Sequence, residues 1–107
     1  MRLHRLKTWP EPFQAVLDGR KTHEARVDDR GFAVGDGLVL LEYEPMTSSG
    51  FGALTCRWAI VTVEYVTPGG RFGVERGACV MSVKLLERGC GDGARFKAER
   101  NLERSTP

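Results

Sequence analysis

The segment Gly19–Arg26 places an unusual number of chemically active side chains close together. It reads Gly-Arg-Lys-Thr-His-Glu-Ala-Arg, with three cations, one carboxylate, one hydroxyl and one imidazole. Successive side chains of an extended chain point to opposite faces. One face would then hold Thr22, Glu24 and Arg26, and the other Ala25 and Val27. We expect the small and apolar pair to face the core, and the polar set to project together into solvent or into a cleft.

This polar set suits two kinds of chemistry. Lys21 as a point charge and Arg26 as a planar fork could hold a phosphate or the edge of a nucleobase, and Glu24 could accept a hydrogen bond from an exocyclic amine. Alternatively, Lys21 and Glu24 could transfer protons in a hydrolase, because burial can turn a lysine into a base. The structural alternative is a solvated edge strand, in which a Glu24–Arg26 pair contributes less than about 1 kcal/mol.

Two further residues are candidates for ligand binding. Trp9 lies between a predicted strand and two prolines, where it could stack on a base for roughly 1–3 kcal/mol or simply cover a short helix. Arg71, in a glycine-rich segment, could clamp a phosphate or remain an ordinary solvated cation. We expect His23 to face away from the polar set and therefore not to act in catalysis. Tyr43 and Tyr65 are expected in the core.

Composition limits the function further. The chain has 107 residues, which is the size of one domain, and a net charge of +2 from 16 basic and 14 acidic residues. Any contact with nucleic acid must therefore come from local clustering of charge. No apolar run approaches the roughly 20 residues that cross a bilayer, so we expect no membrane partner. The absence of a signal peptide favours a cytoplasmic protein.

The three cysteines also favour a cytoplasmic protein. Cys56, Cys79 and Cys90 are odd in number and form no Cys-x-x-Cys pair. This pattern favours reduced thiols in a cytosol over a disulfide framework. We expect no zinc site and no cofactor.

The elements that must position these residues are mostly strands. We predict strands at Leu3–Thr8, Glu24–Val27, Leu38–Tyr43, Arg57–Val66 and Ala78–Leu86, and a short helix at Pro12–Asp18. Leu38–Tyr43 has apolar residues at both odd and even positions, as in a strand buried on both faces. The pattern indicates an α+β domain over residues 1–87, in which about five strands and one short helix form a mixed sheet that closes on itself as a small barrel. Residues 88–107 are predicted to be a polar tail, frayed or weakly helical.

Several blocks occur in an order that resembles a known family. They are Leu6–Phe13, Gly19–Arg26, Asp29–Asp36, Glu42–Pro45, Gly69–Gly73 and Cys79–Val83. Over Leu3–Leu86 the chain is similar to the ASCH/PUA-like superfamily, and within it to the DUF3850 group of small bacterial and phage proteins. The resemblance implies a small PUA-like mixed β-barrel of five or six strands with one or two short helices, and a cleft lined by Gly-x-Lys-Thr-x-Glu-x-Arg. It also implies recognition of RNA or of a modified nucleobase.

The same resemblance leaves other functions open. Some superfamily members are amidohydrolases acting on acylated cytidine, and others are ribonucleases. The amidohydrolase pattern has a threonine three residues after its lysine, but here Glu24 occupies that position and Thr22 directly follows Lys21. This departure removes the expected nucleophile. A third possibility is a protein-interaction factor of a phage or mobile element, which the near-neutral charge favours.

Overall fold

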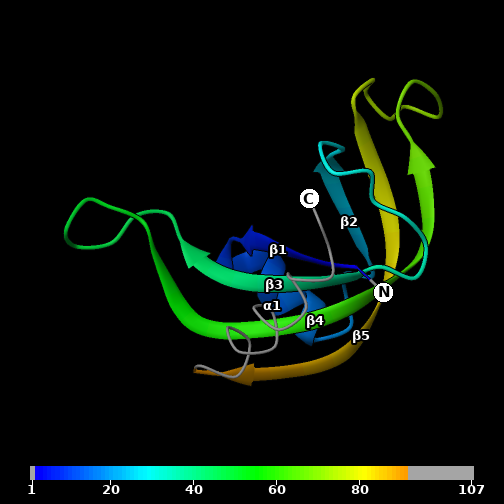
Figure 1. Ribbon diagram of the computed structural model, residues 1–107. Coiled ribbons are helices and arrows are strands. Elements are labelled where there is room, and N and C mark those ends of the chain that lie inside the picture. Colours follow the sequence, from blue (N-terminus) through cyan, green and yellow to red (C-terminus); the bar gives the residue numbers. More distant parts are fainter. Residues whose placement is uncertain (1, 92–107) are drawn as a thin grey trace.

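The computed structural model describes residues 2–91, which form one curled sheet and one helix (Figure 1). In chain order the elements are β1 (Leu3–Thr8), α1 (Pro10–Leu17), β2 (His23–Val27), β3 (Gly37–Glu44), β4 (Ala53–Pro68) and β5 (Ala78–Cys90). The strand order in the sheet is β1-β3-β4-β5-β2. The β1–β3 pair is parallel and the other pairs are antiparallel. The predicted small α+β fold with a mixed sheet is confirmed.

The sheet is a half-barrel, so the prediction of a closed barrel was wrong. The strand order leaves β1 and β2 as the two edges. Side chains span the seam between these edges: Arg26 donates to the carbonyl of Lys7, and Arg30 to the carbonyl of Arg5, both at 3.1 Å. Guanidinium groups therefore occupy carbonyls that a neighbouring strand would otherwise use, which protects the edge of β1.

The helix begins earlier than predicted, at Pro10, and ends at Leu17. Proline suits the first turn of a helix because the amide hydrogens there have no partner within the helix. Phe13 and Val16 are buried and join the larger core cluster, which includes Leu38, Leu40 and Met81. Two turns of helix are marginal alone, so this packing is what holds α1 in place.

The central strands form the core, as expected from their apolar sequence. Leu38, Val39 and Leu40 are fully buried, so β3 is covered on both faces as predicted. Tyr43 is only partly buried, and Tyr65 is exposed, so the expected core position of Tyr65 was wrong. Residues Leu3, Val39, Trp58 and Ile60 make a second cluster on the other face of the sheet.

Strands β4 and β5 are longer than predicted. They bend at irregularities in their pairing, between Ile60 and Val61 and between Val63 and Tyr65; such bulges increase the twist of a strand pair. β5 continues past Leu86 to Cys90, paired with β4. Most of the predicted tail, residues 92–107, lies outside the described residues. Within residues 2–91 no helix has the length and apolar character needed to span a bilayer.

Candidate functional site

Strand β2 presents its polar face inward, which is the reverse of the expected arrangement. Glu24 is only 3% exposed, whereas Val27 is 70% exposed and Ala25 also faces outward. The prediction that Ala25 and Val27 face the core was therefore wrong. β2 pairs on one side only, with β5, and is therefore an edge strand of the half-barrel. A carboxylate can be buried there because cations in the same segment compensate its charge.

The Glu24 carboxylate lies between two cations. Its Oε1 accepts a hydrogen bond from Lys21 Nζ at 3.0 Å, and its Oε2 accepts one from Arg26 Nε at 3.3 Å. The side chains of Lys21 and Arg26 are 19% and 23% exposed. Both oxygens of a deeply buried carboxylate are thus engaged, while the two cations still reach the surface.

The backbone of Gly19–Thr22 is anchored at both ends, which fixes Lys21 beside the strand. Gly19 has a left-handed φ of 76°, which closes α1, and the amide of Lys21 donates to the carbonyl of Ala15 at 3.0 Å. The carbonyl of Thr22 accepts a hydrogen bond from the amide of Val83 at 3.0 Å. The cation is therefore carried by an ordered connection between α1 and the sheet.

Arg26 joins β2 to the first strand. Besides Glu24, it donates to the carbonyl of Lys7 and to Thr8 Oγ1, each at 3.1 Å. Thr8 is buried on the inner face of β1. Thr8 was not among the predicted site residues; its alternation with buried Leu6 on β1 was the signal that it faces inward.

These residues line a cleft of about 310 Å³. Its wall is formed by Lys7, Thr8, Trp9, Pro12, Lys21, His23, Glu24, Ala25 and Arg26. Trp9 is 62% exposed, and its carbonyl accepts the amide hydrogen of Phe13 at 2.9 Å, so an exposed aromatic ring is carried on the first turn of α1. Four of the predicted ligand-binding residues therefore meet in one cleft: Trp9, Lys21, Glu24 and Arg26.

The other two predicted residues lie elsewhere. Thr22 precedes β2, so the alternation of the strand does not extend to it; it is exposed and lines a different cavity, between α1 and β5. Arg71 lies on the loop between β4 and β5, outside the cleft. His23 is exposed at the rim of the cleft.

A second buried carboxylate, that of Glu42, lies on β3, the strand next to β1 in the sheet. Glu42 of β3 is the register partner of Thr8, and it accepts a hydrogen bond from Thr55 Oγ1 at 2.6 Å. Arg57 Nε lies 3.7 Å from Glu42 Oε1. Each buried glutamate of the half-barrel thus has an arginine beside it. The sequence did not indicate Glu42, because it follows an apolar run and reads as the end of a strand.

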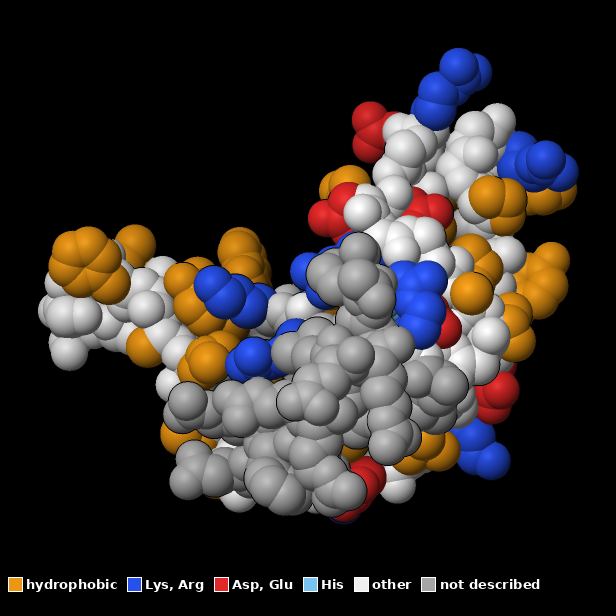
Figure 2. All heavy atoms as spheres, in the orientation of Figure 1, with side chains coloured by type: hydrophobic (Ala, Val, Ile, Leu, Met, Phe, Trp, Pro, Cys, Tyr) orange, Lys and Arg blue, Asp and Glu red, His pale blue; other side chains and the backbone are white. Residues whose placement is uncertain are grey.

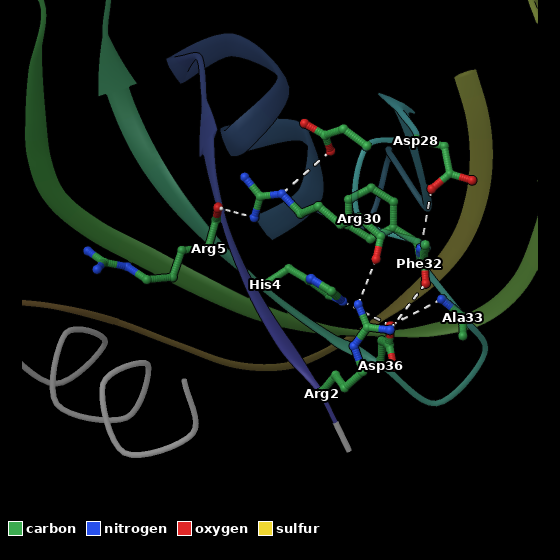
Figure 3. A network of polar contacts seen from close by, with 10 residues as sticks. Arg2, His4, Arg5, Asp28, Arg30, Phe32, Ala33 and Asp36 are labelled. Atoms are coloured by element: carbon green, nitrogen blue, oxygen red, sulfur yellow. Dashed lines mark hydrogen bonds and ion pairs between the residues drawn. The ribbon is translucent and has the colours of Figure 1, made fainter. Parts of the chain in front are cut away.

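The polar network around His4 and Asp36, drawn in Figure 3, is structural. His4 and Asp36 are both buried, and His4 Nε2 lies 2.9 Å from Asp36 Oδ2. The same oxygen accepts the amide of Ala33 at 3.1 Å. This pairing fixes the turn that leads into β3. Among residues 2–91, no group of three or more His, Cys, Asp or Glu side chains could hold a metal ion.

The sequence model of one family, described as domain of unknown function DUF3850, matches residues 3–83. The chain belongs to this family. The matched range runs from β1 into β5, so every residue that lines the cleft lies within the DUF3850 domain. The predicted membership in DUF3850 is confirmed. No curated protein matches the sequence.

Proposed function

We propose that the cleft of this DUF3850 protein binds a nucleobase, either in RNA or in a modified nucleoside. The observation that carries the proposal is the buried Glu24 carboxylate, held between Lys21 and Arg26 in a cleft beside exposed Trp9. A volume of about 310 Å³ lies at the lower end of the roughly 300–1,000 Å³ typical of small-molecule sites. A single base with its sugar suits such a cleft better than a duplex does.

The contacts support different roles for the polar residues in this proposal. Glu24 already accepts from two cations, so its role is to orient them rather than to read the base directly. An ammonium has three donors and a guanidinium has five, so Lys21 and Arg26 retain N–H groups for a ligand. The preferred ligand therefore presents acceptors, such as the carbonyl oxygens and ring nitrogens of a base. Trp9 supplies a face for stacking.

The resemblance to the ASCH/PUA-like superfamily supports the same conclusion. That superfamily is associated with RNA and modified nucleobases, and the segment that would line its cleft is the one that lines the cleft here. We propose that this chain is a PUA-like domain whose barrel is open between β1 and β2, with the guanidinium of Arg26 spanning the opening.

A second candidate function is hydrolysis of a nucleoside or RNA. It is favoured by one observation: Lys21 Nζ lies 3.0 Å from Glu24 Oε1, which is the distance for proton transfer. Thr8 lines the same cleft and carries a hydroxyl. In this alternative, Lys21 and Glu24 are the proton-transfer pair, and Thr8→Val should abolish turnover if its hydroxyl is the nucleophile.

The test is a screen of nucleosides and short single-stranded RNAs at low ionic strength, by thermal shift and by tryptophan fluorescence. We expect binding that weakens about tenfold in Trp9→Ala and in Lys21→Met, with Lys84→Gln on β5 as a charge-matched control outside the cleft. A folded protein that binds none of these ligands would contradict the proposal. Analysis of the bound mixtures for products separates binding from hydrolysis.

A partner protein would use a different surface. Figure 2 shows hydrophobic side chains gathered on the projecting β3–β4 hairpin, where Met46 and Phe51 are exposed. Charge substitutions in the cleft would leave binding at that hairpin unchanged. The same Lys21→Met variant therefore distinguishes a ligand in the cleft from a protein on the hairpin.

A further inference from the structure

The seam between β1 and β2 contains a second cavity that adjoins the cleft. Its volume is about 420 Å³, and it shares Lys7 and Arg26 with the cleft. Asp29 and Arg30 are among its polar lining residues, and Phe32 is one of its apolar ones. The two cavities thus follow one another along the open edge of the half-barrel, with Arg26 at their common boundary.

Two guanidinium groups bracket this second cavity. Arg26 donates to the carbonyl of Lys7 and Arg30 to the carbonyl of Arg5, each at 3.1 Å. Carbonyls two residues apart on one strand edge are separated by about 6–7 Å, which sets the scale of the gap between the two guanidinium groups that bind them. One phosphate, with a hydrogen bond of roughly 2.8 Å on each side, fills such a gap.

Both guanidinium groups keep donors for a ligand. Arg26 uses three of its N–H groups on Glu24, Lys7 and Thr8 among the described residues. Arg30 donates to the carbonyl of Arg5 and lies 3.5 Å from the carboxylate of Asp29. A guanidinium has five donors, so each arginine retains at least two. In Figure 3 the Arg5 side chain extends to the opposite side of β1 from Arg30, so Arg5 contributes its carbonyl here.

Charge also favours an anion at this position. The single negative charge of buried Glu24 is shared between Arg26 and Lys21, so it does not neutralise both cations. The charge of Arg30 is neutralised only in part by Asp29, whose side chain is largely exposed. Forked guanidinium groups suit phosphate oxygens because they present two parallel N–H donors. The apolar lining by Phe32 suits a sugar rather than a second charge.

We infer that the second cavity is a phosphate-binding subsite, and that the ligand of the cleft is a nucleotide whose phosphate lies between Arg26 and Arg30. This inference rests on the proposed function, because the cleft must hold the base. It adds that a nucleotide binds better than the free nucleoside. A terminal phosphate and the phosphodiester of an RNA chain present the same group to the two arginines.

The test compares each of the four ribonucleosides with its 3′- and 5′-monophosphates and with a dinucleoside monophosphate, by calorimetry on the full chain. We expect the phosphate to raise affinity at least about tenfold, roughly the strength of one hydrogen bond to a charged group. Arg30→Gln should remove that gain and leave nucleoside binding within about twofold, and Arg30→Lys should restore part of it. Lys84→Gln is the control variant outside both cavities.

The variant Asp29→Asn is expected to raise phosphate affinity, whereas Arg30→Gln lowers it. It leaves Arg30 itself unchanged, so it remains informative if a substitution at Arg30 destabilises the fold. It removes the neighbouring carboxylate and leaves the Arg30 contact with Arg5 intact, so monophosphate affinity should rise about two- to threefold. The gain from phosphate should also fall with salt, by roughly 0.7 in the logarithmic slope for one phosphate. A gain confined to monophosphates indicates a terminal phosphate, and an equal gain for the dinucleotide indicates an RNA chain.

The failures of the two proposals differ. Nucleosides that bind without any gain from phosphate, or with a gain that Arg30→Gln and Asp29→Asn leave unchanged, would overturn the subsite and leave the base cleft intact. Phosphate binding through Arg30, with no contribution from any base, would contradict the proposed function and retain the subsite. The absence of binding by all these compounds would overturn both.

Discussion

Replacing Glu24 by glutamine tests the central feature of the cleft, the carboxylate held between two cations. Glutamine keeps the size and one acceptor but removes the negative charge, so Lys21 and Arg26 face each other without a counter-ion. Removing one partner of a fully buried ion pair costs about 3–5 kcal/mol. Here the Lys21 and Arg26 side chains are 19% and 23% exposed, so water screens part of that cost. We expect a loss of about 1–2 kcal/mol in the free energy of unfolding.

Urea denaturation measures this loss. A decrease of about 1–2 kcal/mol corresponds to a fall in Tm of roughly 5–10 °C for a domain of this size. The slope of the urea transition should stay the same, because the surface exposed on unfolding does not change. The double variant Glu24→Gln with Lys21→Met should be less destabilised than the sum of the single variants, because the second change removes an uncompensated cation. Lys84→Gln is again the control.

Ligand binding by Glu24→Gln distinguishes the two roles of the carboxylate. If Glu24 only orients Lys21 and Arg26, as its two engaged oxygens indicate, all ligands should weaken about equally. If it reads the base directly, the preferred base should change, because an acceptor is replaced in part by a donor. A stability within about 0.3 kcal/mol of the native protein, together with a changed base preference, would refute the orienting role of Glu24.

Four further outcomes are expected. Burial, with a smaller contribution from Asp28, raises the pKa of Cys79. At pH 8 a thiol reagent should therefore label the exposed Cys56 and Cys90 quickly and Cys79 only on unfolding. Equal labelling rates for the three cysteines would contradict the burial of Cys79. Asp36→Ala should cost about 1–3 kcal/mol in urea denaturation, because His4 and a backbone amide lose their acceptor. Phe13→Ala should cost about 3–5 kcal/mol by the same method, and a cost below 1 kcal/mol would place the ring outside the core. Glu24→Thr should not deacylate an acylated cytidine, since a nucleophile also needs a base and an oxyanion site; robust product formation would reverse the ranking of binding over hydrolysis.

The sequence predicted the core better than the edges. The apolar run of β3 identified a strand buried on both faces, and the periodicity of Phe13 and Val16 identified the buried side of α1. These patterns are local and depend only on hydrophobic burial. The closure of the sheet depends on which groups satisfy the free edge of β1. Here Arg26 and Arg30 bind the carbonyls of that edge, although both are distant from β1 in the sequence. The hydrophobic periodicity of a strand does not indicate such contacts.

The inverted face of β2 has a more specific cause. The prediction assumed that the smaller and more apolar residues, Ala25 and Val27, would be buried. A carboxylate can take that position when cations compensate it, and both cations lie within three residues of Glu24, at Lys21 and Arg26. The information was therefore present in the segment. Charge complementarity, considered together with hydrophobicity, would have favoured the observed orientation.

Arg26 connects the stability of the half-barrel with the shape of the cleft. One guanidinium contacts the carboxylate of Glu24, the carbonyl of Lys7 and the hydroxyl of Thr8, so it crosses the seam and forms the wall between two cavities. A lysine at this position could not replace it, because a single ammonium does not reach three acceptors in this planar arrangement. The open seam is thus compatible with a stable fold because an arginine spans it. The same opening gives a ligand access to the donors that this arginine retains.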